Sequence, residues 1–178
     1  SHDFLTDAFR QQAKVDIAAI RGFRYGTHVA PGPIRMEDLY HFIAIGPLIA
    51  RGTIRGQQLK NQIENAAEGS FSTKVAAWTG GWLFNFSGVT HDFDPWQPNG
   101  SRASRIAVGG KALDAEADYS YASYWYAADP ELINVVPAKN IRVLKDVDGS
   151  PLDGTEVVVR YVQSHPAHMV RTELNRIR

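Results

Sequence analysis

The sequence predicts an α+β domain in which mixed β-sheets are flanked by helices. The chain has 178 residues, the size of one ordinary domain, and its 44% hydrophobic and 21% charged residues are typical of a globular protein. In some segments apolar residues recur at helical spacing. In others they gather into short β-branched or aromatic runs, which favour strands. The two kinds of segment together give the α+β class.

The first half of the chain is predicted to contain three helices and two strands. The first helix carries Phe4, Leu5 and Ala8 at helical spacing. The second begins with Glu37 and Asp38, acids that suit the positive end of a helix dipole. The predicted elements are helices 3–14, 36–43 and 57–67, strands 15–20 and 48–54, and loops 21–33 and 69–81.

The second half is predicted to be mainly strands. Aromatic residues favour strands at 82–93 and 118–126, and strand 102–108 leads into a Gly-Gly pair typical of a hairpin turn. Segment 141–147 is either a short strand or irregular. Segment 154–162 permits two interpretations, because its β-branched run favours a strand while Thr155 before an apolar stripe permits a capped helix. The basic tail from His168 is expected to be peripheral.

Composition and charge exclude several classes of function. Nineteen basic and 19 acidic residues give no net charge, which argues against attachment to nucleic acid or to a membrane surface by bulk charge. The chain has no cysteine, hence no disulfide or thiolate site, and no apolar run long enough to span a membrane. We expect no signal peptide, interpret Ser1-His2 as a cloning scar, and expect residues 3–178 to form one domain of a larger enzyme.

The loop that follows the first predicted strand is rich in arginine. Between Ile17 and Met36 there are three arginines, Arg21, Arg24 and Arg35, and no acidic residue. Arginine presents a planar fork of donors that fits sulfate, phosphate or carboxylate. The loop is therefore a candidate site for a small anion, and the alternative is a turn with ordinary surface arginines.

Other chemical sites find little support in the sequence. His165-Pro-Ala-His168 has no acid nearby, so no metal site is predicted within the chain. Nucleophile and phosphate-loop motifs are missing as well. Trp82 and Trp125 stand near the ends of predicted strands and could line a ligand groove, although such residues more often belong to a core.

Several motifs follow one another in a fixed order. Val15-Asp-Ile-Ala-Ala-Ile-Arg-Gly-Phe-Arg-Tyr-Gly26 leads without a gap to Gly32-Pro-Ile-Arg-Met-Glu-Asp-Leu-Tyr40. Ile54-Arg-Gly-Gln-Gln-Leu-Lys-Asn-Gln-Ile-Glu-Asn65 and Phe86-Ser-Gly88 come later. This series resembles the C-terminal domain of the 5′-nucleotidase family, whose first motif is Ala-Asp-Ile-Ala-Leu-x-Asn-Gly-Gly-Gly-x-Arg. The resemblance covers the whole chain and implies that family's fold and a role in substrate recognition.

The departures from the family pattern concern the ligand. The family's nucleotide-contacting arginine would fall on Gly26, while Arg21 and Arg24 stand where the family has asparagine and glycine. The loop that carries the family's base-stacking aromatic is replaced by residues around 127–133. Together with Glu37-Asp-Leu-Tyr40 and Tyr124-Trp-Tyr126, this arginine-bearing form resembles the thiosulfohydrolases of the Sox sulfur-oxidation pathway, the SoxB group.

This second resemblance implies a periplasmic two-domain hydrolase that releases sulfate from a cysteine-linked thiosulfonate on the carrier SoxYZ. An N-terminal metallophosphoesterase domain would hold two manganese ions, so the present domain alone is expected to be metal-free and inactive. Its arginines would hold the oxyanion, and aromatic residues would line a groove for the arm of the carrier. The implied substrate-binding residues are Arg24, Tyr25, Arg21, His28, Trp82, Asn85, Trp125 and Tyr126.

Two other functions stay open at this point. The first is the substrate domain of a 5′-nucleotidase or another phosphoesterase, which requires nucleotide binding. The second is a non-catalytic module that binds another protein. The sequence upstream of the domain would separate the second from the hydrolases, because only the hydrolases need metal-ligand motifs there.

Overall fold

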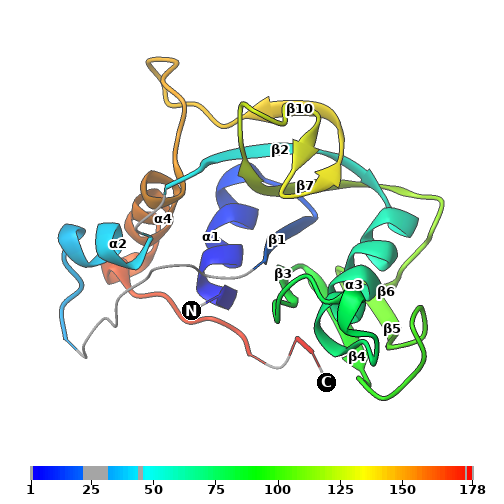
Figure 1. The fold of residues 1–178 in the computed structure, drawn as a ribbon. Coiled ribbons are helices and arrows are strands. Elements are labelled where there is room, and N and C mark those ends of the chain that lie inside the picture. The colour runs from blue at the N-terminus through cyan, green and yellow to red at the C-terminus, as the bar shows by residue number, and fades with distance from the viewer. Residues whose placement is uncertain (1, 22–31, 44–45, 175, 178) are drawn as a thin grey trace.

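A five-stranded sheet forms the middle of the domain, in the order β10-β2-β7-β1-β3 (Figure 1). The computed structural model describes residues 2–21, 32–43, 46–174 and 176–177. Helices lie against both faces of the sheet, which confirms the predicted α+β class with mixed sheets. The strands of this sheet are β1 (Ile17–Arg21), β2 (Leu48–Arg55), β3 (Phe84–Ser87), β7 (Asp118–Trp125) and β10 (Lys139–Val143).

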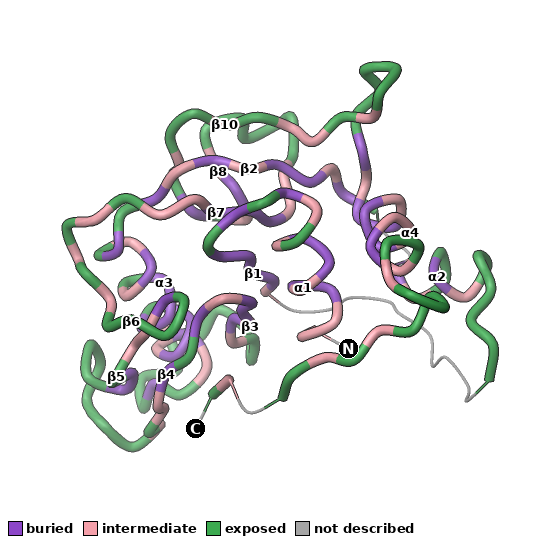
Figure 2. Tube along the Cα trace, turned by 180° about the vertical axis from the view of Figure 1, so that it is seen from behind, coloured by how far each residue is buried: buried purple, intermediate pink, exposed green. Residues whose placement is uncertain are grey.

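The short strand β1 lies between parallel β7 and antiparallel β3 and is buried on both faces. Its side chains alternate between two cores, because successive residues of a strand point to opposite faces. Ile17 and Ala19 belong to one core, and Ala18 and Ile20 to the other. Figure 2 shows the buried residues gathered along this strand and around α1. The last residue of β1, Arg21, therefore emerges from the centre of the domain.

The two cores are built from different elements. The first contains α3 (Gly56–Phe71) and a small sheet, which lie on one face of the main sheet. The second contains three helices on the other face. These helices are α1 (His2–Ala13), α2 (Met36–Phe42) and α4 (Gly154–Gln163). The small sheet consists of β4 (Val89–Phe93), β5 (Ala103–Val108) and β6 (Lys111–Ala112).

The predicted strand 82–93 is wrong as a single element, because the chain turns at Gly88. This glycine has φ +87°, a conformation that other residues rarely adopt. A Cβ atom there would collide with the carbonyl oxygen of Asp16. The segment therefore divides into β3, which joins the main sheet, and β4, which joins the small one.

Helix α3 is longer than predicted. It continues to Phe71, so residues 69–71 are helical rather than part of the predicted loop, and a 3₁₀ turn, η1 (Val75–Ala77), follows. The buried Glu64 anchors a later turn to this helix, since its carboxylate accepts from the backbone N–H groups of Gly100 (3.0 Å) and Ala103 (2.7 Å). Beyond residue 67, the carboxylate of Glu68 pairs with Arg102 at 2.6 Å, and the carbonyl oxygen of Gly69 accepts from the backbone N–H of Thr79 at 3.1 Å. These tertiary contacts stabilise the last turn of the helix.

The ambiguous segment 154–162 is a helix, and its N-cap is Asp153 rather than Thr155. The Asp153 carboxylate accepts from the backbone N–H of Glu156 at 2.9 Å, and the Glu156 carboxylate accepts in return from the N–H of Asp153 at 3.1 Å. This reciprocal pair is a capping box, which fixes where a helix begins. The stripe of valines then packs against α1.

The basic tail from His168 was predicted to be peripheral. This prediction is wrong for Arg176 near the end of the tail. After a 3₁₀ turn, η2 (Pro166–His168), the chain runs back past α1 (Figure 2). The guanidinium of Arg176 contacts both carboxylate oxygens of Asp7 at 2.7 and 2.8 Å, and also donates to the carbonyl oxygen of Phe86 at 2.9 Å. Its backbone carbonyl accepts from the N–H of His91 at 3.1 Å. The tail thereby joins α1 to both sheets.

Two short strands were not predicted at all. They are β8 (Leu132–Ile133) and β9 (Val136–Pro137), which pair as a small hairpin after β7. The following strand, β10, begins at Lys139 and ends at Val143, earlier than the predicted 141–147. The hairpin is important for the site because its residues form one wall of a pocket.

Candidate functional site

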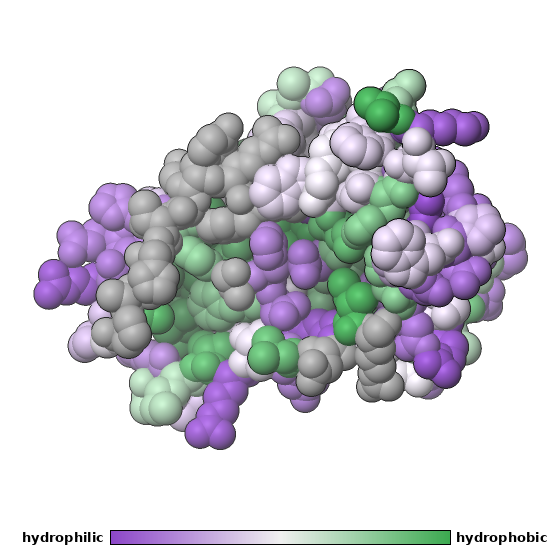
Figure 3. Space-filling view, turned by 60° about the horizontal axis from the view of Figure 1, so that its bottom comes forward, coloured by the Kyte–Doolittle hydropathy of each residue, from purple (hydrophilic) through white to green (hydrophobic). Residues whose placement is uncertain are grey.

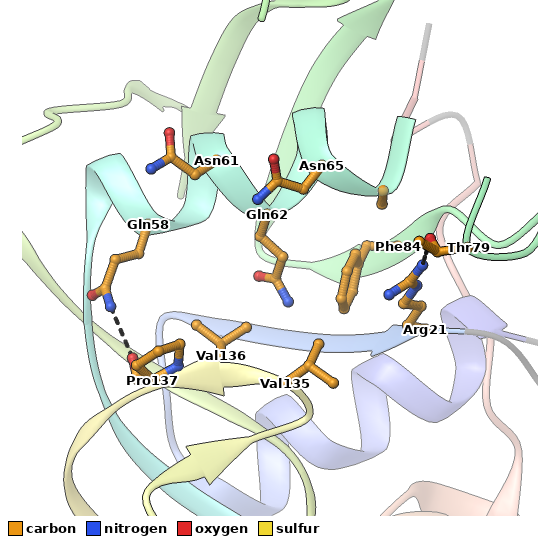
Figure 4. Close-up of a pocket in the computed structure, with 11 residues that line it drawn as sticks. Arg21, Gln58, Asn61, Gln62, Asn65, Thr79, Phe84, Val135, Val136 and Pro137 are labelled. Carbon is orange, nitrogen blue, oxygen red and sulfur yellow. Dashed lines mark hydrogen bonds between the residues drawn. The ribbon is translucent and has the colours of Figure 1, made fainter. Parts of the chain in front are cut away.

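Arg21 lies at the end of β1 and lines a pocket of about 470 Å³. The pocket lies between α3 and the β8–β9 hairpin, with Arg21 and Phe84 at one end (Figure 4). Residues of four segments line it: Arg21, Gln58, Asn61, Gln62, Asn65, Ala66, Thr79, Phe84, Val135, Val136 and Pro137. Arg21 is the one charged residue in this set. Seen from below, where β1 ends, the surface is hollowed and exposes both hydrophobic and hydrophilic residues (Figure 3).

The guanidinium of Arg21 is held by neutral groups. Its Nη2 donates to the Thr79 hydroxyl at 3.2 Å, and its central carbon lies 5.8 Å from the centroid of the Phe84 ring. Among the residues that the structure describes, no carboxylate forms an ion pair with Arg21. The charge of this partly buried guanidinium is therefore not neutralised by the described side chains around it, a property that favours an anionic ligand.

Thr79 is held in position by the C-terminal end of α3. Its backbone N–H donates to the carbonyl oxygen of Gly69 at 3.1 Å, and a Cβ atom at Gly69 would collide with the Thr79 hydroxyl. The indole N–H of Trp78 donates to the carbonyl oxygen of Ser72 at 2.7 Å. These contacts fix the segment that presents the Thr79 hydroxyl to Arg21.

Gln62 supplies the buried polar group of the pocket. This residue is only 7% exposed, and its Nε2 donates to the hydroxyl of Tyr121 at 3.2 Å. Its Oε1 has no hydrogen-bond partner among the described residues. Burial raises the pKa of the Tyr121 hydroxyl, which keeps it protonated. Figure 4 shows the Gln62 amide reaching from α3 into the space above Val135 and Val136.

Of the other predicted site residues, the four that the structure describes do not line this pocket. Asn85 pairs with Ile20 and so belongs to the face of the sheet opposite to Arg21. Trp125 packs against the core on the Arg21 face, and its indole N–H donates to the carbonyl oxygen of Pro130 at 3.3 Å. Trp82 and Tyr126 are exposed. Arg24, Tyr25 and His28 lie outside the described residues.

The lining residues that the sequence analysis missed are mostly uncharged and polar. Gln58, Asn61, Gln62 and Asn65 recur at the spacing of one helix face, a signal that was available in the sequence. The wall formed by Val135, Val136 and Pro137 gave no such signal, because the hairpin that carries it was not predicted.

The described part of the chain contains no group of three or more His, Cys, Asp or Glu residues that could hold a metal ion. Likewise, none of its helices is long and apolar enough to cross a bilayer. The described pocket lining consists of one arginine, side-chain amides, a hydroxyl and apolar groups, which can bind and orient a ligand.

The family model described as "5′-nucleotidase, C-terminal domain" matches residues 1–153, most of the chain. The chain belongs to this family. This confirms the resemblance to this family that the ordered series of motifs indicated. No curated protein matches the sequence.

Solved structures share the fold of this 5′-nucleotidase C-terminal domain. Sulfate thiohydrolase SoxB from Thermus thermophilus has a TM-score of 0.77 at 24% identity, over 98% of this chain and 31% of its own. A 5′-nucleotidase precursor from the same species has a TM-score of 0.73 at 22% identity, over 99% and 34%. NAD nucleotidase from Haemophilus influenzae has a TM-score of 0.68 at 18% identity, over 93% and 30%. The present chain thus spans about a third of each of these proteins.

Proposed function

We propose that this domain is the substrate-recognition part of a metal-dependent hydrolase, a sulfate thiohydrolase of the SoxB type. Its substrate would be a thiosulfonate bound to a cysteine of a SoxYZ-like carrier, and its product sulfate. The observation that carries the proposal is the guanidinium of Arg21, which lines a pocket and has no carboxylate partner among the described residues. The location that this function implies is the periplasm.

In the proposed reaction the oxygen of water bonds to the sulfonate sulfur. The S–S bond breaks with its electron pair on the carrier-side sulfur, which takes one proton of the water, and sulfate and the second proton are released. Arg21 keeps donors beyond the one that Thr79 accepts, and they can bind two sulfonate oxygens and hold the group in place. We assign the same role to Arg24, with hydrogen bonds from Tyr25 and His28. Trp82, Asn85, Trp125 and Tyr126 remain candidates for contacts with the carrier.

The manganese ions of such an enzyme do not fit the described residues of this chain, which contain no suitable ligand group. We therefore assign the metal ions to an N-terminal metallophosphoesterase domain. The contribution of this chain is to bind and orient the sulfonate. Without the other domain it is expected to be inactive.

A 5′-nucleotidase substrate domain is the second candidate function, and the likeness of fold to 5′-nucleotidases favours it. Phe84 is the one aromatic residue among the described residues that line the pocket, and stacking on a nucleobase requires an open ring face. Phe84 is only 4% exposed, with Arg21 over its ring and Phe86 stacked beside it. The pocket therefore suits an oxyanion better than a base.

Calorimetric titration of the 178-residue chain separates the two functions. The ligands are sulfate, S-sulfocysteine, adenosine and adenosine monophosphate. We expect S-sulfocysteine and sulfate to bind and adenosine not to bind. Binding of adenosine, or affinity for the monophosphate alone, would support the nucleotidase instead. If none of the four binds, the third alternative, a protein-binding module, is favoured.

A further inference from the structure

The unpaired amide oxygen of Gln62 requires a physical explanation. A buried acceptor without a partner loses its hydrogen bonds to water and gains none from the protein, so such groups are rare in folded proteins. Gln62 is 7% exposed, yet its Oε1 makes no hydrogen bond with any described residue, while its Nε2 is bound to Tyr121. A ligand with a hydrogen-bond donor would satisfy this atom.

The position of Gln62 defines what kind of ligand that is. It lines the same pocket as Arg21, and the wall opposite its amide is formed by Val135 and Val136 (Figure 4). A ligand that fills the pocket thus meets a guanidinium at one end and a lone acceptor farther along α3. It needs an anionic group, a hydrogen-bond donor separated from that group, and a part between them that tolerates apolar walls.

A peptide that carries the anion on a cysteine side chain meets these requirements. Its main-chain N–H lies a few bonds from the side-chain sulfur, whereas free sulfate or thiosulfate has no N–H to offer. We propose that Gln62 Oε1 accepts a hydrogen bond from the main-chain N–H of the anion-bearing cysteine. Gln62 is then a specificity-determining residue that favours peptide-borne anions over free ones. This inference rests on the proposed function, because it assumes that Arg21 binds the sulfonate.

A ligand analogue tests this contact without any change to the protein. The probe is the blocked dipeptide N-acetyl-glycyl-S-sulfocysteine amide, and its partner is the ester analogue in which oxygen replaces the N–H of the S-sulfocysteine residue. The two differ in the single donor in question. We expect calorimetry of the wild-type chain to give about fivefold to tenfold weaker binding for the ester.

The variant Gln62→Met completes a double-mutant cycle, since methionine keeps the length of the side chain and removes the acceptor. In this variant the amide and ester probes should bind equally, and affinity for free sulfate should stay at the wild-type value. Gln57→Met, the same substitution at an exposed position of the same helix that does not line this pocket, is the control and should keep the difference between the two probes.

The outcomes separate this inference from the proposed function. Equal binding of the amide and the ester by the wild-type chain overturns the role of Gln62 even if the Gln62→Met variant does not fold. If Arg21→Gln then still abolishes sulfate binding, the proposed function survives. If neither probe binds the wild-type chain, both proposals are overturned.

Discussion

Arg21 and Phe84 are directly paired residues of β1 and β3, with the guanidinium carbon 5.8 Å from the centroid of the phenylalanine ring. A cation above an aromatic face is attracted by the negative potential of the ring. Because Phe84 is almost fully buried in the core around α3, the position of Arg21 depends on core packing. The candidate site and the stability of the domain are therefore physically connected.

Replacing Phe84 by leucine should weaken both stability and anion binding. Leucine keeps an apolar side chain in the core but removes the aromatic face below the guanidinium. We expect the free energy of unfolding to fall by about 1 kcal/mol and the affinity for S-sulfocysteine to fall about threefold. Phe9→Leu, in the other core, is the matched control. An equal loss of affinity in both variants would show that the aromatic contact plays no part.

Gly88→Ala should destabilise the domain more than a change at another glycine with positive φ. Alanine at position 88 meets both a left-handed backbone and a collision with the carbonyl oxygen of Asp16. Gly109 also has positive φ, at +56°, but faces open space, so Gly109→Ala measures the backbone strain alone. We expect chemical denaturation to show a loss of about 1 kcal/mol for Gly109→Ala and at least about 3 kcal/mol for Gly88→Ala. Similar losses would mean that the contact with Asp16 relaxes freely.

Arg176→Ala should cost far more stability than removal of an exposed arginine. The side chains of Arg176 and Asp7 are only 13% and 18% exposed, and removal of one leaves the other charge buried without its partner. We expect a loss of about 3 kcal/mol in the free energy of unfolding. The control is Arg35→Ala, because the pair of Arg35 with Glu37 is largely solvent-exposed and contributes little. If both variants unfold at the same denaturant concentration, the tail does not hold the two sheets together.

Mild acid should destabilise the protein through His91. Burial lowers the pKa of this histidine below its usual 6.5, although Asp92 and Glu64 act in the opposite direction. Below pH 6.5 the unfolded chain then binds this proton more readily than the folded one, so stability falls as the pH drops from about 7 to about 5.

Thermal unfolding at several pH values checks this prediction in the wild type and in His91→Phe. The variant should lose less stability over the same range. A residual dependence of stability on pH is expected from His2, because burial lowers the pKa of that histidine as well. Identical pH profiles would mean that His91 does not contribute to the acid sensitivity.

The sequence was most informative where local signals and burial agree. The run 17–20 is apolar at every position and becomes part of a strand buried on both faces, and helix α2 carries acids in its first turn, as expected. The predicted strand 82–93 failed because periodicity cannot show that φ is positive at Gly88 and that two strands of one run join different sheets. Asp153 with Glu156 three residues later is a capping-box pattern in the sequence, and this pair, rather than Thr155, fixes the start of the helix.

The site was predicted less completely than the fold. Arg21 could be selected because three arginines without nearby acids indicate an anion site, and it does line a pocket. Gln62 could not be selected from its residue type, since its importance lies in a buried oxygen left unpaired by the contact with Tyr121. The tail gave no sign that Arg176 pairs with Asp7, because that contact joins opposite ends of the chain.

The most direct test of the account is the affinity of the 178-residue chain for S-sulfocysteine before and after Arg21→Gln. The control is Arg142→Gln, which removes an exposed arginine on β10. A charge-assisted contact predicts a loss of about tenfold or more for Arg21→Gln and wild-type affinity for Arg142→Gln, with both variants folded. Equal affinity of the two variants and the wild type would contradict the claim that Arg21 binds the substrate anion.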